Sequence, residues 1–239
     1  MSRYADTMPL VQDRGFAIDA AVDERLGFIR RTYLHLVGEL ALAGVIPAFV
    51  LSTPALLEGV AMPLAGRPIL YLLSIFGVSL ISRKLLEGNR SIGVQYAGAG
   101  LWVLFLGILV APFAWRAAQI TGGYGVVWQA LTLTACVFTG LTAYVFITKK
   151  DFNFLGGALW VLTMCAFGVG MILWIFKPGM DTMWLSIVFV VLLAGWVLYD
   201  TSKVLHHRHV RQHVAASVDL LVDFVYLFLH ILLLLLPRD

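Results

Sequence analysis

Two aspartates, a tyrosine and a histidine interrupt the last apolar stretch of the chain, residues 214–236. Asp219, Asp223, Tyr226 and His230 follow one another at intervals of four, three and four residues. On an α-helix this spacing puts all four side chains on one face, in a stripe about 16 Å long. An ionised carboxylate in hydrocarbon costs about 2.5–3.5 kcal/mol or more, so we predict that the stripe faces the protein interior or a wet cavity.

Carboxylates held together away from water favour proton and cation chemistry. Two that share one site cannot both ionise cheaply, and they titrate as a pair. Their oxygens are hard ligands of the kind that calcium prefers, so protons and cations would compete for the same atoms. Hydrogen bonding between helices is the alternative role for buried polar residues of this kind.

The elements that must position these residues are membrane-spanning helices. The chain has 239 residues, of which 60% are hydrophobic and 13% charged, and its mean hydropathy is +0.88. Soluble domains carry about 25% charged residues. Apolar blocks of bilayer-crossing length cover residues 32–51, 68–82, 92–114, 124–147, 152–176, 182–200 and 214–236.

These blocks predict an all-α polytopic membrane protein with seven transmembrane helices. Because the polar stripe needs protein around it, we expect the C-terminal helix to be central in the bundle. The block at 68–82 is short unless it continues through the following "SRKLL" or begins before Pro68. Residues 1–24 are predicted to form a polar cytoplasmic tail, and residues 25–239 the transmembrane domain. The segment "AVDERLGFIRR", residues 21–31, lies at the membrane surface or extends the first helix.

The distribution of basic residues predicts the orientation. Thirteen of the 17 lysines and arginines fall in the tail and in every second loop after it, and four fall on the opposite side. Because lysine and arginine collect in cytoplasmic loops, the N-terminus is predicted inside and the C-terminus outside a bacterial plasma (inner) membrane. This topology accounts for the net charge of +3, so the charge indicates no nucleic-acid partner.

With this orientation, two further charged residues reach the cytoplasmic half of the stripe. Asp200 lies near the end of the sixth block in "LYDTSKVL", and Arg83 follows the second block in "SLISRK". We predict that Asp200, Asp219 and Asp223 form a pH-sensing and ion-binding site. Arg83 would neutralise that site as a counter-charge.

Three other groups of polar residues are weaker candidates. Glu39 lies four residues after His35 on one face of the first block, where helix–helix hydrogen bonding or interfacial solvation is the favoured role. His230 is an accessory candidate, although a hydrogen-bonded core histidine is favoured over a relay. A solvated basic loop is favoured over a metal site for the sixth-loop histidines, which are His206, His207, His209 and His213.

Three segments together resemble a known family. They read "FITKKDFNFLGGAL", then "LYDTSKVLHHRHV", then "AASVDLLVDFVYLFLHILLLL". In this order they are similar to the Bax-inhibitor-like family, also called the transmembrane Bax inhibitor motif family, in its bacterial branch. The resemblance covers roughly residues 25–236 and is strongest from residue 144 onward.

The resemblance implies a seven-helix fold with the last helix central, and a pH-sensitive calcium leak channel. It implies a carboxylate dyad of Asp200 and Asp223, which would hold calcium as the transported ion, and no resident cofactor. A latching arginine falls on Arg83, with Lys84 as the fallback. The family usually has a small or amide-like polar residue where this chain has Asp219, so the acidic site is larger here.

Two other functions remain open. Bacterial members of the family are known to associate with a membrane-bound AAA protease. A regulatory interaction protein of a protease or stress-response complex, without transport activity, is therefore the alternative. A metal-dependent membrane hydrolase is less favoured, although the chain has His35, Asp200 and His230. The two histidines would lie roughly 20 Å apart along the membrane normal, and no GxSxG, HExxH or P-loop occurs, so we expect no enzyme activity.

Overall fold

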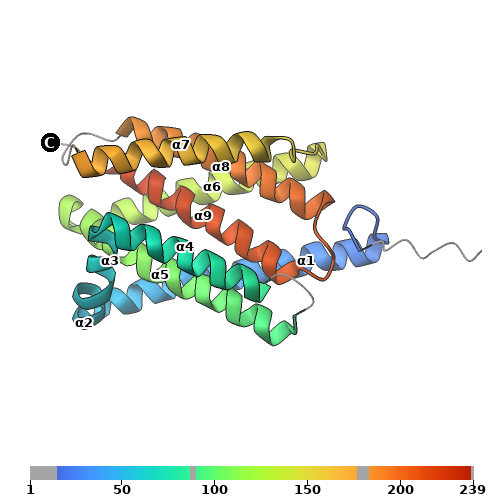
Figure 1. Ribbon diagram of the computed structural model, residues 1–239, viewed down its shortest axis with the longest axis horizontal. Helices are drawn as coiled ribbons and strands as arrows, with labels where there is room; N and C mark the ends of the chain where they lie inside the picture. The colour runs from blue at the N-terminus through green and yellow to red at the C-terminus, as the bar shows by residue number, and fades with distance from the viewer. Residues whose placement is uncertain (1–14, 87–89, 177–182, 238–239) are drawn as a thin grey trace, which may run out of the picture.

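The computed structural model describes residues 15–86, 90–176 and 183–237, and it is a bundle of long helices (Figure 1). Within these ranges seven helices are long and apolar enough to cross a membrane, which confirms the all-α polytopic fold. They are α1 (Val22–Ser52), α4 (Pro68–Leu86), α5 (Ile92–Thr121), α6 (Gly125–Thr148), α7 (Leu155–Phe176), α8 (Met183–His206) and α9 (His213–Leu235). Short helical pieces, α2 (Pro54–Leu56), the π-helical η1 (Leu57–Ala61) and α3 (Met62–Gly66), connect α1 to α4.

The helix boundaries resolve two alternatives that the sequence left open. α1 begins at Val22, so the segment that follows the tail extends the first helix. Asp23 and Glu24 occupy its first turn, where carboxylates interact favourably with the positive end of the helix dipole. α4 continues through "SRKLL" to Leu86, which gives it a spanning length. Residues 1–14 lie outside the described residues, so a tail that ends at residue 24 stays a prediction.

The bundle interior is formed largely by α5 and α9. α9 packs against α1, α5, α6 and α8, and it crosses the middle of the bundle in Figure 1. In the apolar 18-residue windows of α5 and α9, 67% and 56% of the residues are buried. These shares are well above those in the outer helices α4 and α7. α4 packs mainly on α5, and α7 on α8. Because α5 shares the buried position, a uniquely central C-terminal helix stays a prediction.

Glycines allow two of the helix pairs to approach closely. A Cβ atom on Gly107 of α5 would lie 2.6 Å from the side chain of Ile46 on α1. A Cβ atom on Gly156 of α7 would lie 2.7 Å from the ring of Tyr199 on α8. Such close approach strengthens the van der Waals packing that helps membrane helices to associate, because lipid competes with every apolar side chain.

We expect Gly107→Ala to lower the thermal unfolding temperature of the purified protein. The added methyl group overlaps Ile46, and overpacking of this kind costs about 1–3 kcal/mol. Gly100→Ala on the same helix is the matched control, because no heavy atom lies within 4 Å of its added Cβ atom. Alanine stabilises a helix interior relative to glycine by about 1 kcal/mol. Equal unfolding temperatures for the two variants would contradict the tight α1–α5 contact.

Candidate functional site

Three aspartates from α8 and α9 meet in the cytoplasmic half of the predicted topology. Asp200 and Asp223 are buried, with 8% and 6% of their surface exposed, whereas the Asp219 side chain is one third exposed. Asp200 and Asp219 both interact electrostatically with Asp223, and with each other. The structure therefore brings together the three carboxylates that the helical spacing and the topology singled out.

Two basic residues neutralise part of this acidic cluster, which we define as Asp200, Asp219 and Asp223. Lys203 Nζ lies 3.4 Å from Asp200 Oδ1 and 3.7 Å from Asp219 Oδ2. Arg208, in the loop between α8 and α9, forms an ion pair through Nη2 with Asp219 Oδ2. Lys203 thus bridges two of the carboxylates from within α8, and Arg208 adds a second positive charge at the outer edge.

Asp223 is the carboxylate without a matching cation. In the part of the chain that the structure describes, no ion pair reaches it, and its Oδ2 atom has no hydrogen-bond partner. Three acidic side chains therefore share two basic ones. When all five groups are ionised, the cluster carries an excess of one negative charge, which either a proton or a bound cation can balance.

Arg83 does not supply the counter-charge in this structure. It lies exposed in the last turn of α4, as does Lys84. Among the described residues, no ion pair joins either of them to the acidic cluster. The neighbouring Ser82 is buried and donates a hydrogen bond to the Gly98 carbonyl oxygen on α5 at 2.9 Å, which fixes that end of α4. The basic residues at the cluster are Lys203 and Arg208.

The N-terminal segment holds the loop that carries Arg208. The Ala17 amide donates to the Arg208 carbonyl oxygen at 2.8 Å, and the Val210 amide donates to the Gly15 carbonyl oxygen at 3.0 Å. The rings of Phe16 and His209 lie 4.3 Å apart, and Ala17 is fully buried. These contacts tie the described end of the tail to the backbone that positions the Arg208 guanidinium.

The accessory candidates lie apart from the acidic cluster. Glu39 is buried, and its Oε1 lies within hydrogen-bonding distance, 2.9 Å, of Ser217 Oγ, on a different face of α9 from Asp219. The His230 ring stacks on Phe189 with 4.5 Å between ring centroids. His35 contacts Tyr96 on α5 through a 2.8 Å hydrogen bond.

The residues considered for a hydrolase are likewise dispersed. His35, Asp200 and His230 each have separate neighbours. Over residues 15–86, 90–176 and 183–237, no three histidine, cysteine or acidic side chains are grouped so as to hold a metal ion.

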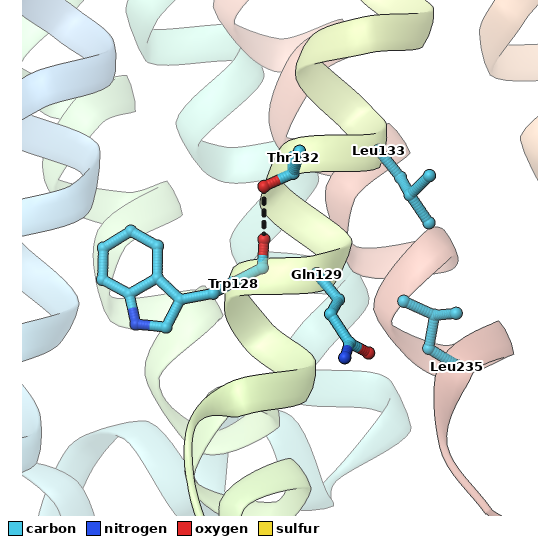
Figure 2. Close-up of a pocket in the computed structure, with 5 residues that line it drawn as sticks. All are labelled: Trp128, Gln129, Thr132, Leu133 and Leu235. Carbon is cyan, nitrogen blue, oxygen red and sulfur yellow. Dashed lines mark hydrogen bonds between the residues drawn. The ribbon is translucent and has the colours of Figure 1, made fainter.

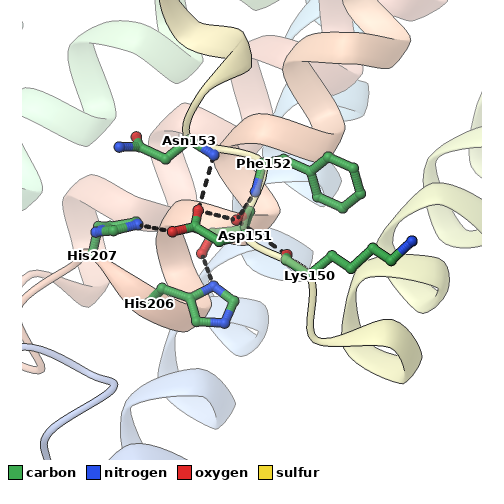
Figure 3. A network of polar contacts seen from close by, with 7 residues as sticks. Lys150, Asp151, Phe152, Asn153, His206 and His207 are labelled. Atoms are coloured by element: carbon green, nitrogen blue, oxygen red, sulfur yellow. Dashed lines mark hydrogen bonds and ion pairs between the residues drawn. The ribbon is translucent and has the colours of Figure 1, made fainter.

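Two histidines at the C-terminal end of α8, His206 and His207, take part in a polar network at the α6–α7 turn (Figure 3). Asp151 accepts hydrogen bonds from the Asn153 amide at 2.9 Å, from Ser202 Oγ at 3.2 Å and from His207 Nε2 at 2.8 Å. His206 bonds the Ser202 carbonyl oxygen through Nδ1 at 3.0 Å. His207 and Ser202 thus join the end of α8 to the turn, whereas the His206 bond lies within α8.

The charge of Asp151 makes this network pH-dependent. Partial burial by itself would raise the pKa of Asp151, but hydrogen bonds from the Asn153 amide, His207 and Ser202 outweigh it and lower the pKa. Because its pKa is lower in the folded protein, ionised Asp151 stabilises the fold at pH values above its ordinary pKa, near about 4. This stabilisation disappears as the pH falls through the folded-state pKa.

We expect Asp151→Asn to destabilise the protein at neutral pH by about 1 kcal/mol or less, because the side chain is half exposed and solvent screens the pair. The difference from the unsubstituted protein should shrink below about pH 4 and vanish once the pH has fallen through the lowered folded-state pKa. Thermal unfolding between acidic and neutral pH measures both effects. The exposed Asp19→Asn serves as the control. A destabilisation that persists unchanged in acid would show that charge is not its source.

A shallow groove near the opposite end of the bundle is separate from the acidic cluster. Trp128, Gln129, Thr132 and Leu133 of α6 and Leu235 of α9 surround a volume of about 450 Å³ (Figure 2). Leu235 lies about 18 Å along α9 from Asp223. The groove has an apolar lining and an exposed tryptophan, which suits contact with lipid chains.

Sequence reasoning missed the roles of Lys203 and Arg208 at the cluster, and for Glu39 it favoured helix–helix hydrogen bonding without identifying Ser217 as the partner. Lys203 carried a detectable signal, because it follows Asp200 by three residues on the same helix face. No sequence pattern indicated that Arg208 would reach the cluster, because the direction of its side chain depends on backbone pairing between the loop and the N-terminal segment.

Comparison with known proteins places this geometry in context. The sequence model of the family described as "Inhibitor of apoptosis-promoting Bax1" matches residues 25–239. The Escherichia coli K12 protein named "Modulator of FtsH protease YccA" is 31% identical over 170 residues, which cover 70% of this chain and 74% of that protein. "Uncharacterized protein PA2604" of Pseudomonas aeruginosa is 26% identical over 93% of this chain and 96% of its own length. "Protein lifeguard 4" of Mus musculus is 28% identical over 89% of this chain and 86% of its own length.

Proposed function

Since this chain belongs to the Bax inhibitor family, whose model matches residues 25–239, with bacterial relatives that support its bacterial branch, we propose that it is a pH-sensitive calcium leak channel. The acidic cluster would be its ion-binding and pH-sensing site. The observation that supports this proposal is the charge imbalance: three carboxylates share Lys203 and Arg208, and no ion pair among the described residues reaches the buried Asp223.

The chemistry of the cluster suits an exchange between protons and calcium. Carboxylate oxygens are the ligands that calcium prefers, and Asp200 and Asp223 would be the principal donors. Lys203 occupies the space between Asp200 and Asp219, so a cation that enters must displace its ammonium group. Protonation of the cluster weakens its hold on calcium, and it also weakens its hold on Lys203 and Arg208. Calcium binding is therefore expected to strengthen as the pH rises.

The proposed setting is a bacterial inner membrane with the N-terminus in the cytoplasm. In that orientation the acidic cluster would lie toward the cytoplasmic end, with the Arg208 loop at its mouth. The loop and the N-terminal segment would form a closure that neutralises the cluster at rest.

Calcium flux into protein-containing liposomes tests the proposal. The protein is reconstituted with a calcium indicator inside the vesicles, and flux is followed across the pH range in which carboxyl groups in proteins titrate. Flux that exceeds that of protein-free liposomes and changes with pH would support the channel. Flux equal to that of protein-free liposomes at every pH would overturn it.

A second candidate is regulation of a membrane AAA protease without transport. It is favoured by the relative named a modulator of FtsH protease and by the packing of the N-terminal segment on the α8–α9 loop. Co-purification of the full chain with such a protease, lost when residues 1–24 are removed, would support it. Stable, partner-free protein that conducts calcium would favour the channel.

A further inference from the structure

A second polar seam runs between α1 and α9, away from the acidic cluster. His35 and Glu39 of α1 face His213 and Ser217 of α9 at the same four-residue spacing. The ring centroids of the two histidines lie 5.0 Å apart, and Ser217 Oγ lies 2.9 Å from Glu39 Oε1. Ser217 precedes Asp219 by two residues, a rotation of about 200°, so the seam and the cluster use opposite faces of α9.

Hydrogen-bond counting at Ser217 indicates that the Glu39 carboxyl carries a proton. Ser217 Oγ lies 2.9 Å from Glu39 Oε1 and also 2.9 Å from the Val214 carbonyl oxygen. An ionised Glu39 and the carbonyl group would both be acceptors, yet the hydroxyl has one hydrogen to donate. A protonated Glu39 removes the conflict: it donates to Ser217 Oγ, and Ser217 donates to Val214.

The surroundings of Glu39 favour the same state. The residue is 8% exposed, and its Oε2 atom has no hydrogen-bond partner among the described residues. No ion pair within those residues reaches it. An ionised carboxylate in such a place would be left uncompensated, which is far more costly than an unpaired carbonyl oxygen of the neutral acid.

The titratable groups near Glu39 come from the three helices that meet at the seam. His35 and, one turn earlier, Arg31 lie on α1, His213 lies on α9, and Tyr96 lies on α5. His35 Nδ1 bonds the Arg31 carbonyl oxygen at 2.6 Å, so this nitrogen carries a hydrogen. Its Nε2 lies 2.8 Å from the Tyr96 hydroxyl. Both histidines are half-buried and lie one helical turn from Glu39, toward the cytoplasmic end of the predicted topology.

We propose that Glu39 is a second proton-binding site, separate from the acidic cluster, which exchanges its proton with the cytoplasmic side through His35 and His213. On release, the O–H bond of Glu39 breaks and an N–H bond forms on a histidine ring, and the imidazolium then passes a proton to water. The ionised Glu39 would compete with Val214 for the Ser217 hydrogen and weaken the α1–α9 contact. Proton binding at this seam would thereby favour tight packing of α1 on the helix that carries Asp219 and Asp223.

Infrared spectroscopy of the full chain in lipid bilayers tests this site without any transport measurement. The Asp200→Asn/Asp223→Asn protein is used as the background, so the remaining buried carboxyl signal does not come from the dyad. We expect a carbonyl band of a protonated acid near neutral pH that Glu39→Gln removes. The exposed Glu58→Gln should leave it unchanged. Ser217→Ala should retain the band at a shifted frequency, because a hydrogen bond is lost.

Transfer of the sample into heavy water tests the route. The deuterium shift of the Glu39 band should slow at least tenfold in His35→Ala/His213→Ala. A band that survives Glu39→Gln, or its absence from the background protein, would overturn the proton site. An exchange rate unchanged by loss of both histidines would overturn the route. Because no ion flux is measured, these outcomes are independent of whether the protein conducts calcium.

Discussion

Asp223→Asn should abolish the pH-dependent part of the calcium flux and reduce flux at neutral pH at least about tenfold. The substitution keeps the shape of the side chain but removes the buried carboxylate of the acidic cluster that no ion pair reaches within the described residues. The remaining Asp200 and Asp219 are balanced by Lys203 and Arg208, so the site has no excess charge to attract calcium. Interaction between close charges near a protein surface is worth about 4 kcal/mol, so tenfold is a conservative expectation.

The liposome assay measures this effect directly, with Asp19→Asn as a control that removes an exposed carboxylate outside the membrane spans. The control should behave as the unsubstituted protein does. If Asp223→Asn conducts calcium with an unaltered pH profile, the acidic cluster is not the pH sensor. The channel would then need another site.

Arg208→Gln should have the opposite effect and increase calcium flux several-fold. It leaves Asp219 without its guanidinium partner and raises the negative charge of the cluster. It also removes the positive group that the loop holds over the cluster, so both changes favour the entry of a divalent cation. Flux in the same liposomes, with circular dichroism to verify folding, measures the outcome.

Arg83→Gln is the matched control for this prediction, because Arg83 lies exposed at the end of α4 and no ion pair in the described residues joins it to the cluster. We expect it to change flux little. A large increase in Arg83→Gln with none in Arg208→Gln would restore the latch that the family resemblance implied and would assign Arg208 a purely structural role.

Helical periodicity was sufficient to predict which acidic side chains share a face. Asp219 and Asp223 are four residues apart on one helix face, and the alternating directions of the helices place Asp200 in the same half of the membrane as these two residues. The seven spans followed from apolar length alone, and the structure confirms them. These features depend on local geometry, which each helix carries in its own sequence.

Loop direction and helix register were not predictable in the same way. Arg208 reaches Asp219 because Gly15 and Ala17 pair with the loop backbone, and such a contact has no periodic signal. The Glu39–Ser217 bond depends on how far α1 is displaced along α9, and apolar side chains alone permit several displacements. Gly107 against Ile46 is one of the contacts that select the observed arrangement of α1 in the bundle.

Proton release on calcium binding tests most directly whether the acidic cluster exchanges one for the other. Calcium is added to the purified protein in weakly buffered detergent solution, and released protons are measured with a pH indicator. The unsubstituted protein should release protons as calcium binds, most strongly in mildly acidic solution, whereas Asp223→Asn should release none. Calcium binding without proton release in the unsubstituted protein, or equal release from Asp223→Asn, would contradict the account.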